Sequence, residues 1–485
     1  MLDQKKAPLM EALKVCAQRQ HAPFYAPGHK RGVGISQYLA DFLGKKVFAA
    51  DLPELPELDN LFAPEGVIKE AQQLAAEAFG AEQTWFLVNG STAGIIAAIL
   101  ATCTTGEKII LPRNVHSSAI SGLILSGAVP IFINPEYNSE WEIANTITPE
   151  SVALALEQHP DAKAVMVLSP TYWGVCADIK ALARITHKYN IPLIVDEAHG
   201  AHFGFHPDLP PSALSCGADL TIQSTHKVLG AITQASMLHI QGKRIIRERI
   251  NQTLQLVQTT SPSYLLLASL DAARQQIALK GEILMSKTLQ LADEARARIS
   301  KIPGLSVLQP PKQKTPGFFA FDRTRLTVSV ADLGLSGYEA DVILRKELGV
   351  TAELPSPRHL TFIITFGNTP ADIDCLVQGF TILSKNYRRF PLPPSPSFSF
   401  SLLSLLSLSP RQAFSAATET LPISECVGRV SAEIVCAYPP GIPILMPGEM
   451  ISASALNELQ QVIAGGGVIT GCNDPSLQTL RVVVN

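Results

Sequence analysis

Between residues 84 and 240 the sequence alternates short apolar runs with segments of helical periodicity. The apolar runs are rich in Val, Ile and Leu, and they fall at residues 84–88, 108–111, 129–133, 163–168, 191–195, 219–223 and 235–240. Amphipathic stretches lie between several of them, as at residues 91–103, 151–158 and 179–189. Buried strands separated by helices form a mainly parallel sheet with helices on both faces, so an α/β fold is predicted. Such sheets bind ligands at the carboxyl ends of their strands, which makes the residues after each strand the first candidates for a site.

The length of the chain, 485 residues, predicts more than one domain. A long helical pattern at residues 268–299, followed by strand-like pieces near 317–321, 325–330 and 360–366, predicts a second, smaller α+β region. Residues 391–410 are a low-complexity run of Pro, Ser and Leu, for which we expect a flexible linker, with an interaction helix as the alternative. The expected division is an N-terminal arm (1–60), a large domain (61–265), the small α+β region (266–390), the linker (391–410) and a C-terminal α+β domain (411–485).

Composition argues against several classes of function. The formal net charge is −3 and no segment concentrates Lys and Arg, so neither nucleic acid nor an anionic membrane is expected as a partner. The eight cysteines are scattered without a C-x-x-C pair, which favours reduced, mostly buried thiols over zinc sites or disulfides. The N-terminus has no apolar leader segment and no apolar run is long enough to span a bilayer, so we expect a soluble, cytoplasmic protein.

The string LIVDEAHG, residues 193–200, ends a predicted strand with a carboxylate, that of Asp196. The letters DEAH also occur in helicases, but a nucleotide-hydrolysing fold needs a G-x-x-x-x-G-K-[ST] loop upstream, and the sequence contains none. His199 and His202 have a spacing seen in metal sites, yet no carboxylate or cysteine completes a ligand set, so no metal is expected.

A second string, QSTHKVLGAITQAS, places Lys227 after another predicted strand and beside Val, Leu and Gly residues. Desolvation lowers the pKa of a lysine and makes its amine a Schiff-base nucleophile; the alternative is a surface lysine that extends to solvent. The pair Lys227 and Asp196 supplies the two parts that pyridoxal phosphate (PLP) needs. The lysine forms the imine, and the carboxylate keeps the pyridine nitrogen protonated so that the ring can accept electrons.

A phosphate site is predicted in VNGSTAG, residues 88–94, where a strand runs into an apolar helix. Backbone N–H groups at the start of that helix, with the hydroxyls of Ser91 and Thr92, suit a phosphate dianion. The alternative is that Ser91 is only a helix cap. Ser224 and His226, which flank Lys227, are further candidates.

Together these strings resemble the fold-type I PLP enzymes and, within them, the ornithine/lysine/arginine decarboxylase family. The lysine motif of that family is matched by Ser224, His226 and Lys227, by Gly-Ala at 230–231 and by TQAS at 233–236. Ile222 departs from it, because a small residue is usual there. Further strings that resemble the family are APGHKRG (26–32), LPELDNLFAPEGVI (55–68), LPRNVHSS (111–118), SPTYWGV (169–175), TTSPSYLLLASLD (259–271) and YPPGIPILMPGE (438–449). The resemblance covers nearly the whole chain, although the N-terminal wing domain of longer members has no counterpart here and the low-complexity linker is unusual.

The resemblance implies a role for each matching residue. Lys227 corresponds to the lysine that carries PLP, and Asp196 to the partner of the pyridinium. Ser91, Thr92, Ser224 and His226 correspond to the residues that bind the cofactor phosphate. His116 corresponds to the histidine that stacks on the pyridine ring. His199 lies where some relatives place an aromatic residue at the ring. Thr260 and Ser261 resemble residues that reach the cofactor phosphate of a neighbouring subunit, which implies a homodimer or larger homo-oligomer.

The expected function is therefore PLP-dependent decarboxylation of arginine, lysine or ornithine, releasing CO2 and a di- or polyamine precursor. A terminal cation on the substrate needs an acidic partner, for which Glu353 and the acidic stretch 51–59 are candidates. One alternative is another fold-type I chemistry, aminotransferase or aldol-type lyase, with Arg358 as a possible carboxylate clamp. The other alternative is a PLP-binding protein without activity.

Overall fold

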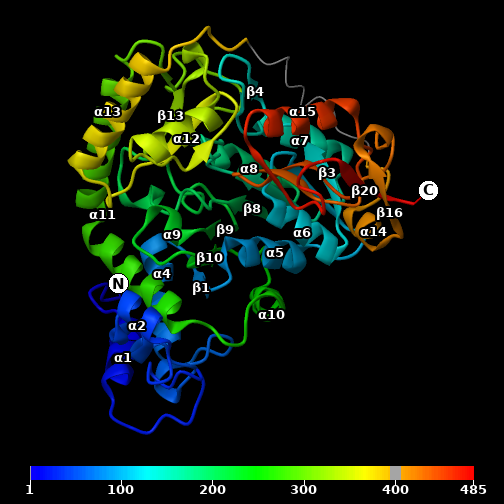
Figure 1. The fold of residues 1–485 in the computed structure, drawn as a ribbon. Coiled ribbons are helices and arrows are strands. Elements are labelled where there is room, and N and C mark those ends of the chain that lie inside the picture. Colours follow the sequence, from blue (N-terminus) through cyan, green and yellow to red (C-terminus); the bar gives the residue numbers. More distant parts are fainter. Residues whose placement is uncertain (1, 394–405, 485) are drawn as a thin grey trace. The chain divides into compact units, whose positions relative to one another are not determined.

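The seven apolar runs predicted between residues 84 and 240 are all β-strands in the computed structural model, which describes residues 2–393 and 406–484 (Figure 1). The chain divides into two units: Met1–Ala101 with Val195–Leu284, and Thr102–Ile194 with Met285–Asn485. Strand β8 (Leu193–Asp196) and helix α11 (Tyr264–Ile299) each begin in one unit and end in the other.

In the first unit the strand order is β1-β10-β9-β8. Strand β10 (Ser236–Ile240) lies antiparallel between β1 (Gln83–Leu87) and β9 (Leu220–Gln223). The unit's helices are α1 (Pro8–Gln18), α2 (Gln37–Leu43), α3 (Lys45–Ala50), α4 (Val67–Phe79), α5 (Gly90–Thr102), α9 (Thr225–Val228) and α10 (Arg247–Val257). Helix α5 lies close to the sheet because it carries Gly94, where a Cβ atom would stand 2.7 Å from Leu87 and 2.9 Å from Ile222. This glycine makes room for Ile222, the residue that departs from the family pattern.

The N-terminal residues are bound into the first unit. Helix α1 buries Leu9 and Leu13, and the carboxylate of Asp271 on α11 accepts hydrogen bonds from the backbone N–H groups of Leu9 (3.0 Å) and Met10 (3.3 Å). Asp271 also pairs with Arg274, and both side chains are fully buried. The N-terminal segment thus satisfies charges that α11 carries into the core.

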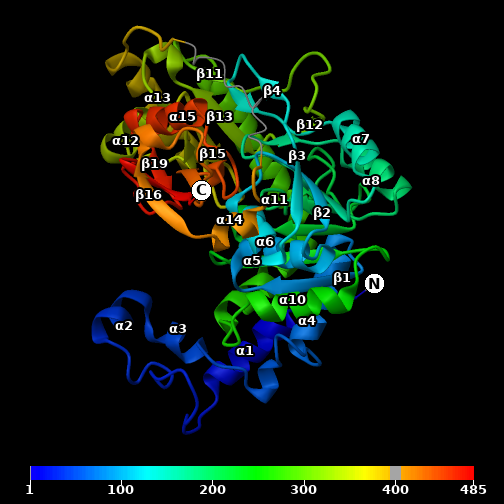
Figure 2. The same ribbon diagram turned by 90° about the vertical axis from the view of Figure 1, so that its right-hand side faces the viewer.

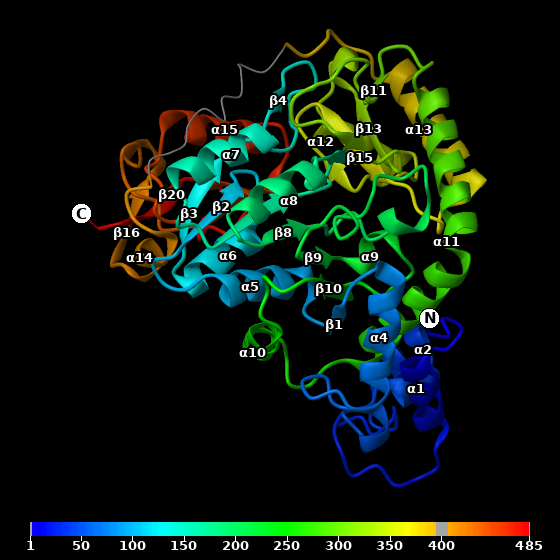
Figure 3. The same ribbon diagram turned by 180° about the vertical axis from the view of Figure 1, so that it is seen from behind.

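In the second unit the strand order continues as β8-β6-β2-β3, and β2 (Lys108–Pro112) is parallel to both β6 (Ala164–Leu168) and β3 (Val129–Ile133). Helices α7 (Pro149–Gln158) and α8 (Ile179–Lys188) pack side by side (Figure 3). The remaining elements here are α6 (Ser117–Ser126), β4 (Tyr137–Asn138), β5 (Ile143–Ala144), β7 (Val175–Cys176) and β12 (Ala320–Phe321).

The predicted small α+β region has a four-stranded antiparallel sheet of order β11-β13-β15-β14. Its strands are β11 (Ser306–Val307), β13 (Arg325–Ser329), β14 (Leu354–Pro355) and β15 (His359–Ile363), with helices α12 (Gly337–Glu347) and α13 (Pro370–Asn386). These elements share an apolar core that includes Leu326, Leu360 and Phe380.

The C-terminal elements, orange to red in Figure 2, have an apolar core of their own that includes Val435, Leu459 and Val482. They are α14 (Pro410–Ser415), α15 (Ala453–Ala464) and the strands β16 (Thr418–Pro422), β17 (Val435–Tyr438), β18 (Ile442–Leu445), β19 (Val468–Thr470) and β20 (Thr479–Val483). Of the predicted linker at 391–410, residues 394–405 lie outside the described part of the chain.

All eight cysteines carry free thiols. Within residues 2–393 and 406–484, no helix combines the length and the apolar character needed to cross a membrane.

Candidate active site

Lys227 lies where strand β9 passes into helix α9, a single turn of helix rather than an open loop. Its Nζ atom is 2.9 Å from Nε2 of His199, and the neighbouring side chains of Val228 and Leu229 are buried. Lys227 itself is half-buried. The amine therefore lies in a largely apolar turn, in contact with an imidazole. Its predicted reaction with a cofactor stays a prediction.

Asp196 ends strand β8, and the whole residue is 8% exposed. Its Oδ1 atom accepts a hydrogen bond of 3.1 Å from the backbone N–H of Ala198. Burial raises the pKa of the Asp196 carboxyl, and the Ala198 N–H and the positive charge of Lys227 only partly oppose this. A cation placed against this carboxylate would relieve that cost.

The first part of the lysine motif, around His226, is hydrogen-bonded to its last part, at Ala235. The backbone N–H of His226 donates to the carbonyl of Ala235 at 3.2 Å, and the ring Nδ1 of His226 lies 3.0 Å from the same oxygen. Nδ1 therefore carries a proton, and Nε2 is the ring nitrogen left for another partner, to which it donates only when the ring is protonated. Gln234 has a left-handed backbone, φ +86°, and its side-chain amide donates to the carbonyl of Val88. The motif is thereby fastened to the end of β1, where the predicted phosphate site begins.

The predicted phosphate ligands Ser91 and Ser224 are in contact. The Ser224 hydroxyl donates to the Ser91 hydroxyl at 2.8 Å, although Ser91 lies in the first turn of α5 and Ser224 precedes α9. Ser224 is fully buried, Ser91 is half-buried and Thr92 is exposed. Helix α5 begins at Gly90, whose φ of +75° favours glycine and turns the chain sharply from strand to helix. Two hydroxyls at the start of a thirteen-residue helix suit a phosphate group.

The segment that contains Thr260 and Ser261 is anchored just before these residues. Gln258 accepts a hydrogen bond from the N–H of Val88 at 2.8 Å, and the N–H of Thr259 donates to Asn89 at 3.1 Å. Thr260 and Ser261 themselves are exposed. Their predicted reach into a neighbouring subunit stays a prediction.

His116, Glu353 and Arg358 belong to the second unit, so their roles toward Lys227 stay predictions. His116 caps helix α6, and its Nδ1 accepts the N–H of Ser118 at 3.1 Å. Glu353 is exposed and precedes β14. Arg358 pairs with Glu142 at 3.3 Å and donates to the carbonyl of Pro393 at 2.7 Å, so its guanidinium already has acidic and carbonyl partners.

The acidic stretch 51–59 is occupied by local contacts. Asp51 pairs with His29 at 3.1 Å, Glu57 pairs with Arg19, and Glu54 accepts a bond of 2.8 Å from the side chain of Asn60. Asp59 receives backbone N–H groups at the start of α4, among them Gly66 at 2.7 Å and Ile68 at 3.1 Å. Burial raises the pKa of Asp59, but the backbone hydrogen bonds outweigh burial and lower it. These acids stabilise the loop before α4, which weakens the prediction that they read a substrate charge.

One buried polar chain was missed by the sequence analysis. Glu197 accepts hydrogen bonds of 2.8 Å from the N–H of Ala213 and from the amide of Gln223, which lies 3.1 Å from His239 Nε2. Nδ1 of His239 lies 2.7 Å from the Thr84 hydroxyl. Burial raises the pKa of Glu197 to about 7 and lowers the pKa of His239 to about 3. The acidic pair at 196–197 was the only signal in the sequence, because the partners come from distant strands.

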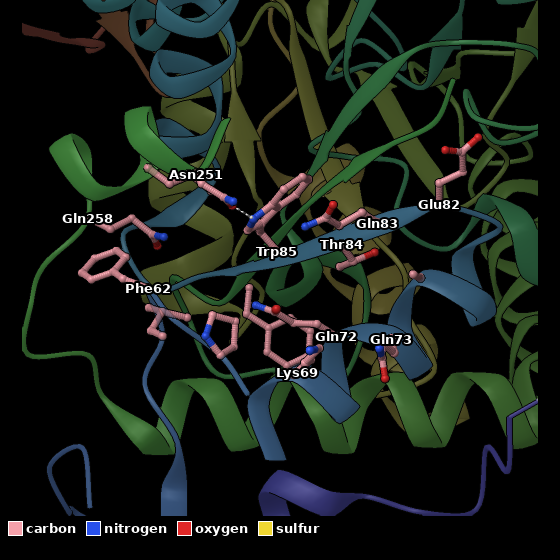
Figure 4. Close-up of a pocket in the computed structure, with 15 residues that line it drawn as sticks. Phe62, Lys69, Gln72, Gln73, Glu82, Gln83, Thr84, Trp85, Asn251 and Gln258 are labelled. Carbon is pink, nitrogen blue, oxygen red and sulfur yellow. Dashed lines mark hydrogen bonds between the residues drawn. The ribbon is translucent and has the colours of Figure 1, made fainter. Parts of the chain in front are cut away.

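A cavity of about 410 Å³ lies elsewhere in the first unit, between β1, α4 and α10 (Figure 4). Side-chain amides of Gln72, Gln83 and Asn251 line it, and Trp85 donates its indole N–H to Asn251 at 2.6 Å. Neither Lys227 nor the predicted phosphate ligands line this cavity, so it is separate from the candidate site.

His199 and His202, which have metal-like spacing, make different contacts. His199 faces the Lys227 amine, whereas the ring of His202 packs on Phe203 with centroids 4.8 Å apart. Across the described residues, no group of three His, Cys, Asp or Glu side chains is arranged to hold a metal ion.

The donor set of the first unit suits PLP. Lys227 offers a primary amine, Asp196 a buried carboxylate with raised pKa, and Ser91 and Ser224 a pair of hydroxyls at a helix start. These groups would hold the aldehyde carbon, the ring nitrogen and the phosphate of that cofactor, respectively.

Known proteins resemble this chain over nearly its whole length. Profiles described as "Orn/Lys/Arg decarboxylase, major domain" and "Orn/Lys/Arg decarboxylase, C-terminal domain" match residues 7–326 and 400–463. The chain is 40% identical over 483 residues to an arginine decarboxylase of Bacillus subtilis, covering 99% of both chains. It is 41% identical over 484 residues to an arginine decarboxylase of Halalkalibacterium halodurans, covering 100% of this chain and 99% of the relative. The solved constitutive lysine decarboxylase of Escherichia coli superposes with a TM-score of 0.83 at 22% identity, covering 100% of this chain and 82% of that one, which confirms the predicted fold class.

Proposed function

Because the chain belongs to the Orn/Lys/Arg decarboxylase family, it is a decarboxylase of a basic amino acid, and we propose that its substrate is arginine and that Lys227 carries PLP. The observation that carries the cofactor proposal is the contact of 2.9 Å between the Lys227 amine and His199, one turn beyond the buried strand β9. The arginine proposal is supported by relatives named arginine decarboxylase, which are 40% and 41% identical over almost the whole chain.

When bound, PLP supplies an electron sink for the pair of electrons released as the carboxylate leaves as CO2. The residues of the chain make that sink effective. Asp196 would hold the ring nitrogen protonated, and the positive charge of that ring would offset the cost of burying the Asp196 carboxylate. Ser91 and Ser224 would hold the phosphate and so limit the movement of the ring.

Two groups are candidates to return a proton to the substrate carbon. The Lys227 amine could deliver that proton, and His199 at 2.9 Å would keep the amine oriented. His226 uses Nδ1 on the carbonyl of Ala235, so only its Nε2 is available to a phosphate or a proton. We assign the proton transfer to Lys227 and the phosphate contact to His226.

The aminotransferase alternative depends on Arg358 as the residue that binds the substrate carboxylate, and Arg358 already has other partners. Arg358 pairs with Glu142 and donates to a backbone carbonyl, so a substrate carboxylate would have to displace these partners. A decarboxylase needs no such clamp, because a poorly solvated carboxylate leaves more readily.

Glu353 is proposed to pair with the terminal cation of the substrate. Its carboxylate is exposed, and its backbone is fixed by a hydrogen bond of 3.0 Å to the carbonyl of Thr361. Glu353→Gln should lower kcat/KM for arginine by about ten- to hundred-fold, the value of one charge-assisted bond of roughly 1.5–3 kcal/mol. The loss should be far smaller for norleucine, whose side chain carries no cation. Equal losses for both substrates would show that Glu353 does not read the charge.

The same proposal includes assembly and cellular role. Thr260 and Ser261 are exposed, which is compatible with contact to a neighbouring subunit in a homodimer or larger homo-oligomer. We place the enzyme in the cytoplasm and its product among the precursors of polyamines, because decarboxylation of a basic amino acid leaves a di- or polyamine precursor.

A substrate panel tests this function. The purified protein with PLP is supplied with arginine, lysine or ornithine, and CO2 and the amine product are measured together. The proposal requires release of both from arginine at a kcat/KM at least tenfold above the other two substrates. Preference for lysine or ornithine would refute the substrate assignment, and pyridoxal bound without CO2 release from any of the three would favour the non-catalytic alternative.

A further inference from the structure

Two strings that resemble the family, LPRNVHSS (111–118) and YPPGIPILMPGE (438–449), are in contact within the second unit. Arg113, which follows strand β2, donates to both oxygens of Glu449 at 3.0 Å each and to the carbonyls of Pro443 (2.7 Å) and Ile444 (3.0 Å). The exposed fractions of the Arg113 and Glu449 side chains are 9% and 2%. Arg113 therefore fixes the C-terminal domain to the carboxyl end of β2, through a buried ion pair with Glu449 and through two carbonyls of strand β18.

The C-terminal domain also holds both ends of helix α6. At its start, the N–H of Ser117 donates to the carbonyl of Gly441 at 3.0 Å. At its end, Arg411 of helix α14 donates to the carbonyls of Ile124 (2.8 Å) and Leu125, which have no partner inside an α-helix. Helices α14 and α6 pack against each other (Figures 1 and 3).

The residue at the start of α6 is His116, and Gly441 lies against its ring. A Cβ atom on Gly441 would stand 3.1 Å from Nε2 and 3.3 Å from Cδ2 of His116. The opposite edge of the ring is fixed because Nδ1 accepts the N–H of Ser118 at 3.1 Å. The loop that carries Gly441 is held in turn by Tyr172, whose hydroxyl donates to the carbonyl of Pro440 at 3.1 Å. The ring of His116 is thus confined at two edges.

We propose that the C-terminal domain is a positioning element for His116, with the loop 438–441 and the contacts at both ends of α6 fixing the plane of its ring. Its consequence for the cofactor rests on the proposed function, in which the protein binds PLP, and on the role that the family resemblance implies for His116, which is stacking on the pyridine ring. A ring that stacks on a cofactor must keep its plane, and misplacement of about 1 Å in such a site is enough to cost about a hundredfold in rate. Gly441 is then required for two reasons, its φ of +84° and the absence of a side chain against His116.

A pair of glycine substitutions separates these two reasons. Gly441→Ala introduces backbone strain and a methyl group against His116, whereas Gly428→Ala, in the same domain at φ +80°, introduces the strain alone because nothing lies within 4 Å of its Cβ position. PLP affinity of the full-length protein is measured by titration of the apoprotein, together with the visible circular dichroism of the bound cofactor. We expect Gly441→Ala to weaken PLP binding at least tenfold and to change the dichroic band, and Gly428→Ala to change affinity less than twofold.

A double-mutant cycle tests whether the effect passes through His116. In a His116→Ala background the methyl group has no ring to displace, so adding Gly441→Ala should weaken PLP binding less than twofold. Should Gly441→Ala fail to fold, Tyr172→Phe frees the same loop without backbone strain and should weaken PLP binding about threefold in the presence of His116 only.

The outcomes are distinguishable from failure of the proposed function. The positioning role would be overturned if Gly441→Ala and Gly428→Ala had equal PLP affinities. It would also be overturned if Gly441→Ala weakened PLP binding as much in the His116→Ala background as in the parent. In either case, PLP on Lys227 of the unaltered protein would still support the proposed function. Absence of PLP from Lys227 in the unaltered protein would overturn both.

Discussion

Breaking the ion pair between Arg113 and Glu449 should release the C-terminal domain from strand β2. Two guanidinium nitrogens reach the two carboxylate oxygens at 3.0 Å, and one of these oxygens also accepts the N–H of Met446 at 3.1 Å. Glu449→Gln therefore leaves a guanidinium that is 9% exposed without its counter-charge. Removal of one partner from a buried pair costs about 3–5 kcal/mol, which is about 150- to 5,000-fold in the equilibrium for local opening.

Amide hydrogen exchange reports that equilibrium locally, so it does not depend on two-state unfolding of the whole chain. Protection should fall by this factor in peptides that cover residues 110–118 and 442–450. The control is Glu419→Gln, which breaks the pair with Arg429 in the same domain, where the carboxylate is 42% exposed. A solvent-exposed pair contributes about 0–1 kcal/mol, so protection should change less than about fivefold.

Replacing both partners of the buried pair refines the test. The double variant Arg113→Met/Glu449→Met removes both charges and should retain more protection than Glu449→Gln alone, because no unpaired charge stays buried. The reasoning would be wrong if Glu449→Gln changed protection no more than Glu419→Gln does.

Three further predictions concern the first unit. Asp196→Asn should still bind PLP but lose most turnover, because the ring nitrogen is no longer held protonated; near-normal turnover would make Asp196 structural. Mixing a Lys227→Ala chain with a Thr260→Ala/Ser261→Ala chain should restore activity through hybrid sites, and full activity of a verified monomer would contradict shared sites. Burial raises the pKa of Glu197 from 4.5 to about 7, so the folded state loses stability as pH rises from 4.5 to 7. Glu197→Gln should abolish the part of this stability loss that comes from Glu197. The difference in melting temperature between the variant and the parent should therefore change between pH 4.5 and 7. A constant difference across this range would show that Glu197 does not titrate there.

The main sheet was predictable because its strands are apolar runs of strand length bounded by turns and helices. The boundaries of β3 (Val129–Ile133) agree with the prediction, and those of the other six strands agree within two residues. The contact of Ser224 with Ser91 also follows from the prediction, since both residues come after strands that end at the same edge.

Hydrogen bonds and ion pairs between distant segments could not be predicted from the sequence. The acids at 51–59 looked available to a substrate cation, but they bind neighbours such as His29 and the N–H groups before α4. Glu197 follows Asp196 directly, and only the folded chain brings it to Gln223 and Ala213. Similarly, nothing within LPRNVHSS indicates that its arginine binds Glu449, more than 300 residues further along the chain.

The most direct test of the account is the site of cofactor attachment. The purified protein is loaded with PLP, reduced with borohydride and digested, and the peptides are sequenced by mass spectrometry. The account predicts a visible absorbance band that is lost in Lys227→Ala, and a phosphopyridoxyl group on the peptide that contains Lys227. A phosphopyridoxyl group on any other lysine, or on none, would contradict the central claim.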